Sequence, residues 1–432
     1  MFQERLSAYL LIEPSERPKV IWACFYFFVL LASYFVLRPI RDEMGILNGA
    51  SNMQWLFTGT FLSMLAIVPV FGILTRKYAI AKVLRVSYLF FIVNIAVFYI
   101  LFRYKLYLDL LPIVFFIWLS VFNLFAVSLF WSFMVDMFTT EQSKRLFGII
   151  AVGGSLGAIL GPLLTQSLIG LLGVENLFLL AMILLCLVLW SLFRLQGMSG
   201  LSKDSVSPGD VKTTVPLLKS ESILSAIIMV WSSPYLQKLV LFMVLYTSVS
   251  TFLYFEQAHI VEDAIPDSAA RVIYFSRIDL VTNIFAISGQ LFLTNRLIRK
   301  FGLAITLCTV PVLIGMGFLL LSKAPVLLVI GSLMILHRAG NFVLLRPGRE
   351  MLYTVCNRKE KYLAKNFLDT AVYRGGDALS GWAFAGLVSL GFGLSWIALI
   401  AVPLIGLWSY TGFRLGKRAE ESSKTYIHQK TN

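Results

Sequence analysis

The chain has 432 residues, of which 58% are hydrophobic and only 14% are charged. A soluble domain carries about 25% charged residues, so the composition excludes an ordinary soluble globular protein and indicates a membrane protein. The net charge of +14 would suit nucleic-acid binding, but basic loops on the cytoplasmic side of a membrane protein give the same excess.

Long apolar runs recur along the chain and are separated by short polar breaks. A helix that crosses a bilayer needs about 20 mostly apolar residues. We predict twelve transmembrane helices, near residues 20–39, 54–74, 83–102, 110–135, 146–171, 177–196, 236–256, 272–297, 302–322, 325–347, 366–389 and 392–413.

The lysines and arginines are unevenly distributed among the loops between these spans. If both termini are cytoplasmic, the outside loops hold few basic residues, chiefly Arg103, Lys105, Arg271 and Lys323, whereas every inside loop is basic. The positive-inside rule therefore predicts cytoplasmic termini. The excess charge then reflects topology, and no nucleic-acid partner is expected.

Residues 197–235 differ from the rest of the chain, because they contain Ser, Pro, Gly and charges with little apolar periodicity. We interpret them as a cytoplasmic linker between a six-helix half at 1–196 and another at 236–432. The later part of the linker aligns Ile223, Ile227, Val230 and Trp231 on one helical face. This part is either a helix along the membrane surface or the ordinary start of the seventh span.

The two halves contain similar sequences at similar positions. LTRKYAIAKVL at 74–84 matches LIRKFGLAITL at 297–307, SYF at 33–35 matches LYF at 253–255, and Gly153 and Gly154 match Gly375 and Gly376. Parallel six-helix halves joined by a cytoplasmic linker are typical of the major facilitator architecture, which rocks one half against the other around a central site. The predicted fold is an all-α membrane protein of two such repeats.

Short motifs of enzyme chemistry are missing from the sequence. Gly153, Gly157 and Gly161 form a small-residue helix face, which indicates close helix packing rather than a phosphate-binding loop. There is no Walker A sequence and no HExxH, and the four cysteines have no paired spacing. We therefore expect no enzyme activity, no metal and no cofactor.

A few charges are expected deep inside the predicted spans. A charge at mid-membrane costs roughly 2.5–3.5 kcal/mol. Counted at 1.5 Å per residue, Arg338 lies about 20 Å into span ten and Arg374 about 12 Å into span eleven, with Asp377 one turn further on. They form either a structural ion-pair network or a site that binds an anion through arginine. Gly375 and Gly376 would let a ligand or a helix approach the backbone.

Other charges lie nearer the ends of the spans. In YFVLRPIRDEMG, Arg38 stands at the outer end of span one, where Pro39 is expected to end or kink the helix. Interfacial snorkelling or a role as an outer gate would both explain Arg38. In LLRPGREML, at the cytoplasmic end of span ten, the positive-inside bias alone accounts for Arg346 and Arg349.

Five further polar residues are candidates for the cavity lining or for coupling. Arg277 and Asp279 enter span eight a little below the outer surface. Asn123 in span four and Glu256 near the end of span seven either line the cavity or serve packing and capping, as does His259.

Five strings carry a resemblance to a known family. YFVLRPIRDEMG with SLFWSFMVDMFTTEQSKRLFGIIAVGGSLGAILGP resembles the ATP:ADP antiporter family, the nucleotide translocases of plastids and intracellular bacteria. STFLYFEQAHIVEDAIPD, RAGNFVLLRPGREML and AKNFLDTAVYRGGDALSGW are similar to its shorter bacterial members of the facilitator type. Arg41 stands where the family has a lysine, and Phe115–Trp131 lacks the family's acidic residue.

The resemblance implies a monomeric antiporter of the bacterial inner membrane that binds ATP and exchanges nucleotides without hydrolysis. The candidate substrate-binding residues are Arg338, Arg374, Arg38, Arg41, Arg277 and Asn123. Two alternatives stay open. One is a carrier of a non-nucleotide solute, proton-coupled through Asp377, Asp279 or Glu256, and the other is a scaffolding protein.

Overall fold

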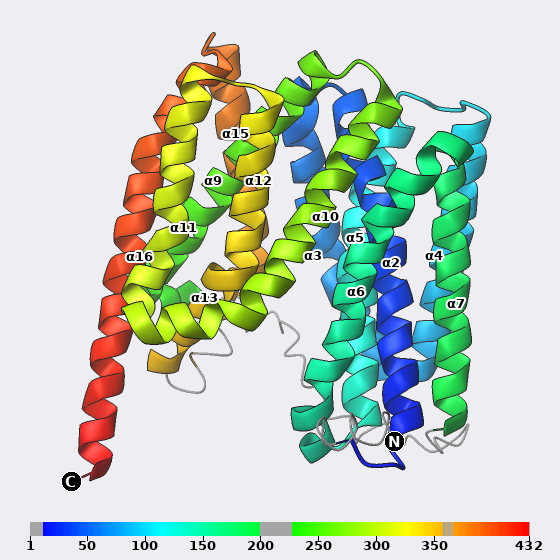
Figure 1. Cartoon of the computed structure of the whole chain (residues 1–432), viewed down its shortest axis with the longest axis horizontal. Helices are drawn as coiled ribbons and strands as arrows, with labels where there is room; N and C mark the ends of the chain where they lie inside the picture. The colour runs from blue at the N-terminus through cyan, green and yellow to red at the C-terminus, as the bar shows by residue number, and fades with distance from the viewer. Residues whose placement is uncertain (1–11, 199–226, 357–359, 361–363, 366, 432) are drawn as a thin grey trace. The chain divides into compact units, whose positions relative to one another are not determined.

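The structure is a computed structural model that describes residues 12–198, 227–356, 360, 364–365 and 367–431 (Figure 1). The described residues are almost all helical and include no strand. The long helices are α2 (Arg17–Leu47), α3 (Met53–Lys77), α4 (Ile80–Arg103), α5 (Leu111–Met137), α6 (Thr140–Leu172), α7 (Asn176–Met198), α9 (Pro234–Ala264), α10 (Ser268–Phe292), α11 (Thr294–Lys323), α12 (Leu327–Gly340), α15 (Tyr373–Ser389) and α16 (Leu394–Thr431).

Eleven helical segments among the described residues are long and apolar enough to cross a membrane. They coincide with eleven of the twelve predicted spans. The tenth consists of α12, the π-helical segment η2 (Asn341–Leu345), α13 (Arg346–Leu352) and the short η3 (Tyr353–Val355). The remaining predicted span, 366–389, is made of the π-helical segment η4 (Leu368–Val372) and the 17-residue α15. The prediction of an all-α, multi-span fold is confirmed.

Pro39 was expected to end or kink the first helix, and it does not end it. Helix α2 continues for eight residues beyond Pro39, to Leu47. Proline removes one backbone hydrogen bond, but helices that cross membranes tolerate it where neighbouring helices support the segment. Ile40, Asp42 and Glu43 are all buried after the proline, so packing holds this last part of the helix in place.

Contacts divide the chain into two compact units. Unit 1 comprises residues 1–47, 66–214 and 267–280, and unit 2 comprises 48–65, 215–266 and 281–432. Most of the predicted linker, residues 199–226, lies outside the described residues. In its last part, residues 227–232 are helical, with Val230 buried and Trp231 exposed.

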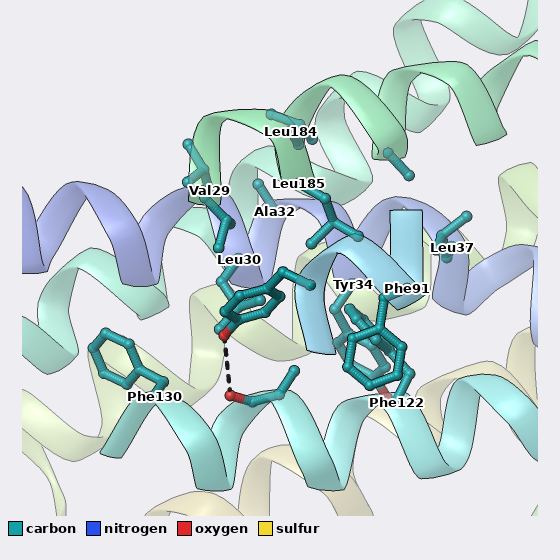
Figure 2. Packing of buried hydrophobic residues seen from close by; sticks show 14 of the residues in the cluster. Val29, Leu30, Ala32, Tyr34, Leu37, Phe91, Phe122, Phe130, Leu184 and Leu185 are labelled. Carbon is teal, nitrogen blue, oxygen red and sulfur yellow. Dashed lines mark hydrogen bonds between the residues drawn. The ribbon is translucent and has the colours of Figure 1, made fainter. Parts of the chain in front are cut away.

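Unit 1 is built around α2, which packs closely against α6. A Cβ atom on Gly153 would lie 2.3 Å from the carbonyl oxygen of Cys24, and one on Gly157 would lie 2.1 Å from that of Phe28. Only glycine permits this approach, so the prediction that the small-residue face serves helix packing is confirmed. Figure 2 shows the adjoining apolar cluster, in which Leu30, Phe91, Phe122, Phe130 and Leu185 are among the buried residues from α2, α4, α5 and α7.

Unit 2 contains α9 at its centre, next to α12, α15 and α16, and the antiparallel pair α11 and α16 (Figure 1). A Cβ atom on Gly416 would lie 2.5 Å from Cα of Ala304, which shows how closely α16 approaches α11. Gly302 interrupts α11 with a φ of 79°, a conformation that favours glycine. The carboxylate of Glu420 then accepts a hydrogen bond of 3.1 Å from the N–H of Ala304 and another from that of Leu303, and so caps the main part of α11.

Candidate functional site

The charged residues that end α2 are paired with carboxylates inside unit 1. Nη1 of Arg38 lies 3.5 Å from Oδ1 of Asp279 on α10, and the side chains are 20% and 1% exposed. Arg41 donates two hydrogen bonds to Oδ1 of Asp42, at 2.6 and 3.0 Å. Its guanidinium also lies over the ring of Phe116. The geometry favours a structural ion-pair role for both arginines over interfacial snorkelling.

A third pair extends this arrangement along α10. Nη1 of Arg271 lies 3.7 Å from Oε1 of Glu43, and both side chains are largely buried. Arg277 is exposed on the same helix. Because α10 begins at Ser268, Arg277 is about 14 Å from the helix start.

In unit 2, Arg374 and Asp377 lie one turn apart and form the predicted pair. Nη1 of Arg374 is 3.5 Å from Oδ2 of Asp377, and the hydroxyl of Thr251 on α9 donates to Oδ1 at 3.3 Å. The side chain of Arg374 is 38% exposed and that of Asp377 is 12% exposed. Asp377 therefore fixes one side of the guanidinium and leaves part of it accessible. The ring of Tyr373 lies 5.3 Å from the guanidinium carbon.

The two adjacent glycines have different surroundings. A Cβ atom on Gly376 would lie 2.4 Å from Oγ1 of Thr247, so α9 approaches the backbone here. A Cβ atom on Gly375 would meet nothing closer than Cζ of Phe61, at 3.8 Å. Gly376 thus permits the close contact of two helices, whereas Gly375 leaves ordinary space beside Arg374.

Arg338 occupies the last turn of α12 and is half-buried. His337 beside it is buried and stacks on Tyr246 of α9, with ring centroids 5.5 Å apart. The ring of Tyr246 also lies 6.0 Å from that of Tyr373. His337 and Tyr373, the chain neighbours of Arg338 and Arg374, therefore both contact the ring of Tyr246.

Both deep arginines lie next to π-helical segments, which often occur at functional sites. Arg338 lies three residues before η2, and Arg374 lies two residues after η4. The π-helical turns were not predicted, because nothing in the local apolar pattern distinguishes them from an α-helix.

The cause of η2 can be followed through its hydrogen bonds. Pro347 has no N–H to donate to the carbonyl of Val343, so the hydroxyl of Thr294 donates to it instead, at 2.8 Å. The N–H of Arg346 donates to Asn341, five residues back. The carbonyl of Phe342 then receives a hydrogen bond from the side chain of Gln290 at 3.2 Å. Side chains at the end of α10 and the start of α11 thus stabilise the irregular turn.

Arg349, which the basic bias of a cytoplasmic surface would explain, also has a specific acidic partner in the structure. Its side chain is only 14% exposed and lies 3.2 Å from the carboxylate of Asp369 in η4. Lys365 and Glu350 form a second pair at 2.7 Å. Two ion pairs therefore connect the end of span ten to the start of span eleven, while Arg346 is exposed.

The remaining polar candidates are Glu256 and His259 in α9 and Asn123 in α5. Glu256 is fully buried in α9, and neither carboxyl oxygen has a hydrogen-bond partner among the described residues. Nδ1 of His259 is 2.8 Å from the carbonyl of Phe255 in the same helix. Asn123 is half-buried in α5. In the part of the chain that the structure describes, no three His, Cys, Asp or Glu residues are grouped as metal ligands.

Comparison with known proteins decides the family. Residues 20–346 match the Major Facilitator Superfamily. The chain belongs to this superfamily. As a major facilitator protein it is an integral, multi-pass membrane protein and a secondary transporter of a small solute. None of the curated proteins matches the chain by sequence.

Solved structures of several major facilitator transporters share the fold. The nucleoside transporter NupG is 12% identical, with a TM-score of 0.61 over 93% of this chain and 99% of NupG. A POT family transporter in complex with 5-aminolevulinic acid is 12% identical, with a TM-score of 0.66 over 92% and 96% of the two chains. A bacterial homologue of the human lysosomal transporter Spinster is also 12% identical, with a TM-score of 0.59 over 95% and 98%.

Proposed function

We propose that this major facilitator protein carries an organic anion by alternating access, and that the anion is a nucleotide exchanged in the manner of ATP for ADP. The observation that carries the proposal is the partial exposure of the Arg374 side chain. It lies within a predicted span, it is held by Asp377, and it is still 38% exposed.

The chemistry of arginine explains why this favours an anion. A guanidinium has five N–H donors in a planar fork that matches carboxylate and phosphate oxygens. The single ion pair of Arg374, at 3.5 Å, leaves donors available for a ligand. In the apolar interior, an exposed guanidinium needs water or an anion to offset the cost of its charge.

Two further arginines are proposed to contribute. Arg338 lies in a span beside the π-helical segment η2, and Arg277 is exposed within α10. Arg38 and Arg41, by contrast, are held by Asp279 and Asp42 and are mostly buried. We therefore assign the substrate to Arg374 and Arg338 of unit 2, and Arg277 of unit 1 stays a separate candidate.

The nucleotide class is supported by two independent similarities. The charged string after span one and the SLFW and KRLFG strings resemble the ATP:ADP antiporters. One of the solved structures that share the fold is described as a nucleoside transporter. A nucleotide adds to a nucleoside the phosphate group that an arginine fork binds well.

Transport by the purified protein in liposomes tests the proposal. Liposomes are preloaded with ATP, ADP, another nucleotide, a sugar phosphate or no solute, and uptake of labelled ADP is followed. We expect internal nucleotide to accelerate uptake. If neither nucleotides nor sugar phosphates cross while a neutral solute does, the proposal is wrong.

Substitutions link the activity to the site. Arg374→Gln and Arg338→Gln should each raise KM about 10- to 150-fold, the equivalent of losing a charge-assisted hydrogen bond of roughly 1.5–3 kcal/mol. Arg374→Lys should also impair transport, because an ammonium cannot reproduce the planar fork. Arg103→Gln, at the exposed end of α4, is the charge-matched control and should transport normally.

A second candidate is proton-coupled transport of a non-nucleotide solute, which the burial of Glu256 favours. A carboxyl group with no hydrogen-bond partner in a span is a natural place for a proton to bind and leave. An inward proton gradient should then drive uptake in empty liposomes, and Glu256→Gln should abolish that drive. Uptake that depends on internal nucleotide and ignores the gradient would contradict this candidate.

A further inference from the structure

An apolar groove lies between α11 and α16 in unit 2. Its volume is about 470 Å³. The lining includes Cys308, Val312 and Met316, spaced by four residues on α11, and Gly406, Tyr410 and Phe413 on α16. Each set follows the spacing of one helix face, so the groove runs along the two helices.

The two helices pack closely beyond one end of the groove. Near its closed end, a Cβ atom on Gly412 would lie 3.0 Å from the ring of Phe242, and one on Gly416 would lie 2.5 Å from Ala304. Further along α16, a Cβ atom on Gly406 would meet nothing within 4 Å. Glycine at 406 therefore leaves space in the groove instead of allowing close packing.

The length of the groove matches one leaflet of a bilayer. The lining extends from residue 402 to 413 on α16 and from 308 to 316 on α11, which is about 16 and 12 Å at 1.5 Å per residue. Half of a hydrocarbon core of about 30 Å is about 15 Å. The lining contains no charged side chain that would bind a nucleotide and is mostly apolar, whereas a single acyl chain fits its length and chemistry.

Basic side chains lie at one end of the groove. Arg414 directly follows Phe413, and its guanidinium carbon is 5.9 Å from the centre of the Tyr410 ring. Lys417 is exposed one turn further, on the face that carries Tyr410 and Phe413. The carboxylate of Glu420 is engaged by the backbone of α11. Basic groups between transmembrane helices bind anionic lipid head groups.

We propose that this groove binds one anionic phospholipid, with an acyl chain along α11 and α16 and the phosphate group at Arg414 and Lys417. The proposal does not rest on the transported substrate. It assigns two parts of one ligand to two adjoining features, an apolar groove of one-leaflet length and a basic end.

Native mass spectrometry of the purified, delipidated full chain tests the site. The probes are phosphatidylglycerol and phosphatidylcholine with identical acyl chains. We expect the wild type to bind one phosphatidylglycerol in preference to phosphatidylcholine. Arg414→Gln and Lys417→Gln should each reduce that preference about fivefold, the equivalent of about 1 kcal/mol per basic residue. Lys323→Gln, exposed at the opposite end of α11, should leave it unchanged.

A second pair of variants tests the apolar part. Gly406→Leu should fill the groove and lower the binding of both lipids at least tenfold. Gly386→Leu on α15, where a Cβ atom also meets nothing within 4 Å, is the matched control and should bind lipid normally. Met316→Trp fills the groove from α11, so the test stands even if Gly406→Leu does not fold. Equal binding of the two lipids by the wild type, or normal binding by both filled variants, would overturn the proposal.

Discussion

Alanine at two adjacent positions, Gly375 and Gly376, should have opposite consequences for stability. The new methyl group of Gly376→Ala would lie 2.4 Å from Oγ1 of Thr247, so α15 and α9 must move apart. That of Gly375→Ala would make an ordinary contact of 3.8 Å with Phe61. Since Asp377 accepts a hydrogen bond from Thr251 on the same helix as Thr247, the movement would also disturb the pairing of Arg374.

The expected difference in the free energy of unfolding follows from two terms, of which the first is common to both variants and cancels between them. Alanine is favoured over glycine inside a helix by about 1 kcal/mol, and both variants gain this term. Overpacking a close contact costs typically 1–3 kcal/mol, and only Gly376→Ala incurs it. The free energy of unfolding should therefore be about 2 kcal/mol lower for Gly376→Ala than for Gly375→Ala. At roughly 2–4 °C per kcal/mol, the two melting temperatures should differ by about 4–8 °C.

Thermal unfolding of the purified variants in detergent measures this difference. The double variant Gly376→Ala/Thr247→Ala removes Oγ1 and leaves Cβ of residue 247 at 3.3 Å, so it should recover most of the loss. Equal melting temperatures for the two single variants, or no recovery in the double variant, would refute the close contact of α9 and α15.

Three further predictions concern contacts elsewhere in the molecule. Arg38→Gln and Asp279→Asn should each lower the free energy of unfolding by about 3–5 kcal/mol because each leaves a buried charge; a denaturation cycle in which the double variant loses the sum of the two single losses would contradict the pair. Thr294→Val should cost about 1–3 kcal/mol by leaving the Val343 carbonyl without its hydroxyl donor, whereas Thr294→Ser should cost little in the same unfolding assay. Burial alone would raise the pKa of Glu16, but hydrogen bonds from the Glu13 N–H, Gln142 and Arg145 lower it below its ordinary value of 4.5. Its stabilisation is therefore complete above pH 4.5 and is lost as the pH falls through the folded-state pKa, and melting curves against pH should be flatter for Glu16→Gln.

The spans could be predicted because the signal is long and local. An apolar run of about 20 residues is sufficient to identify a membrane-spanning helix, and eleven such helices are present among the described residues. The end of α2 could not be predicted in this way. Residues 40–47 are polar enough to suggest a loop, and they stay helical because Asp42 and Glu43 are buried with partners that include Arg41 and Arg271.

The same difference between local and distant information decides which contacts of the candidate site could be predicted from the sequence. Arg374 and Asp377 lie in one helix, so their spacing alone predicts the pair. Asp279 and Arg38 lie in helices far apart in sequence, and with one sequence nothing predicts that they meet. The π-helical segment η2 is also a distant effect, since it depends on Thr294 and on Gln290 of neighbouring helices.

The number and geometry of partners decide what each arginine in a span can do. Both N–H groups by which Arg41 contacts Asp42 bind the same carboxylate oxygen, and the Phe116 ring lies against its guanidinium carbon, 5.0 Å from the ring centre. To bind a substrate, Arg41 would first have to give up these contacts in a largely buried position. Arg374, which is more exposed, would give up one ion pair of 3.5 Å and at most its contact with the Tyr373 ring, and Asp377 would keep its hydrogen bond from Thr251. A ligand anion can therefore add to Arg374 without first breaking a buried network, which is why substitutions at Arg374 should affect transport before stability and substitutions at Arg38 should affect stability first.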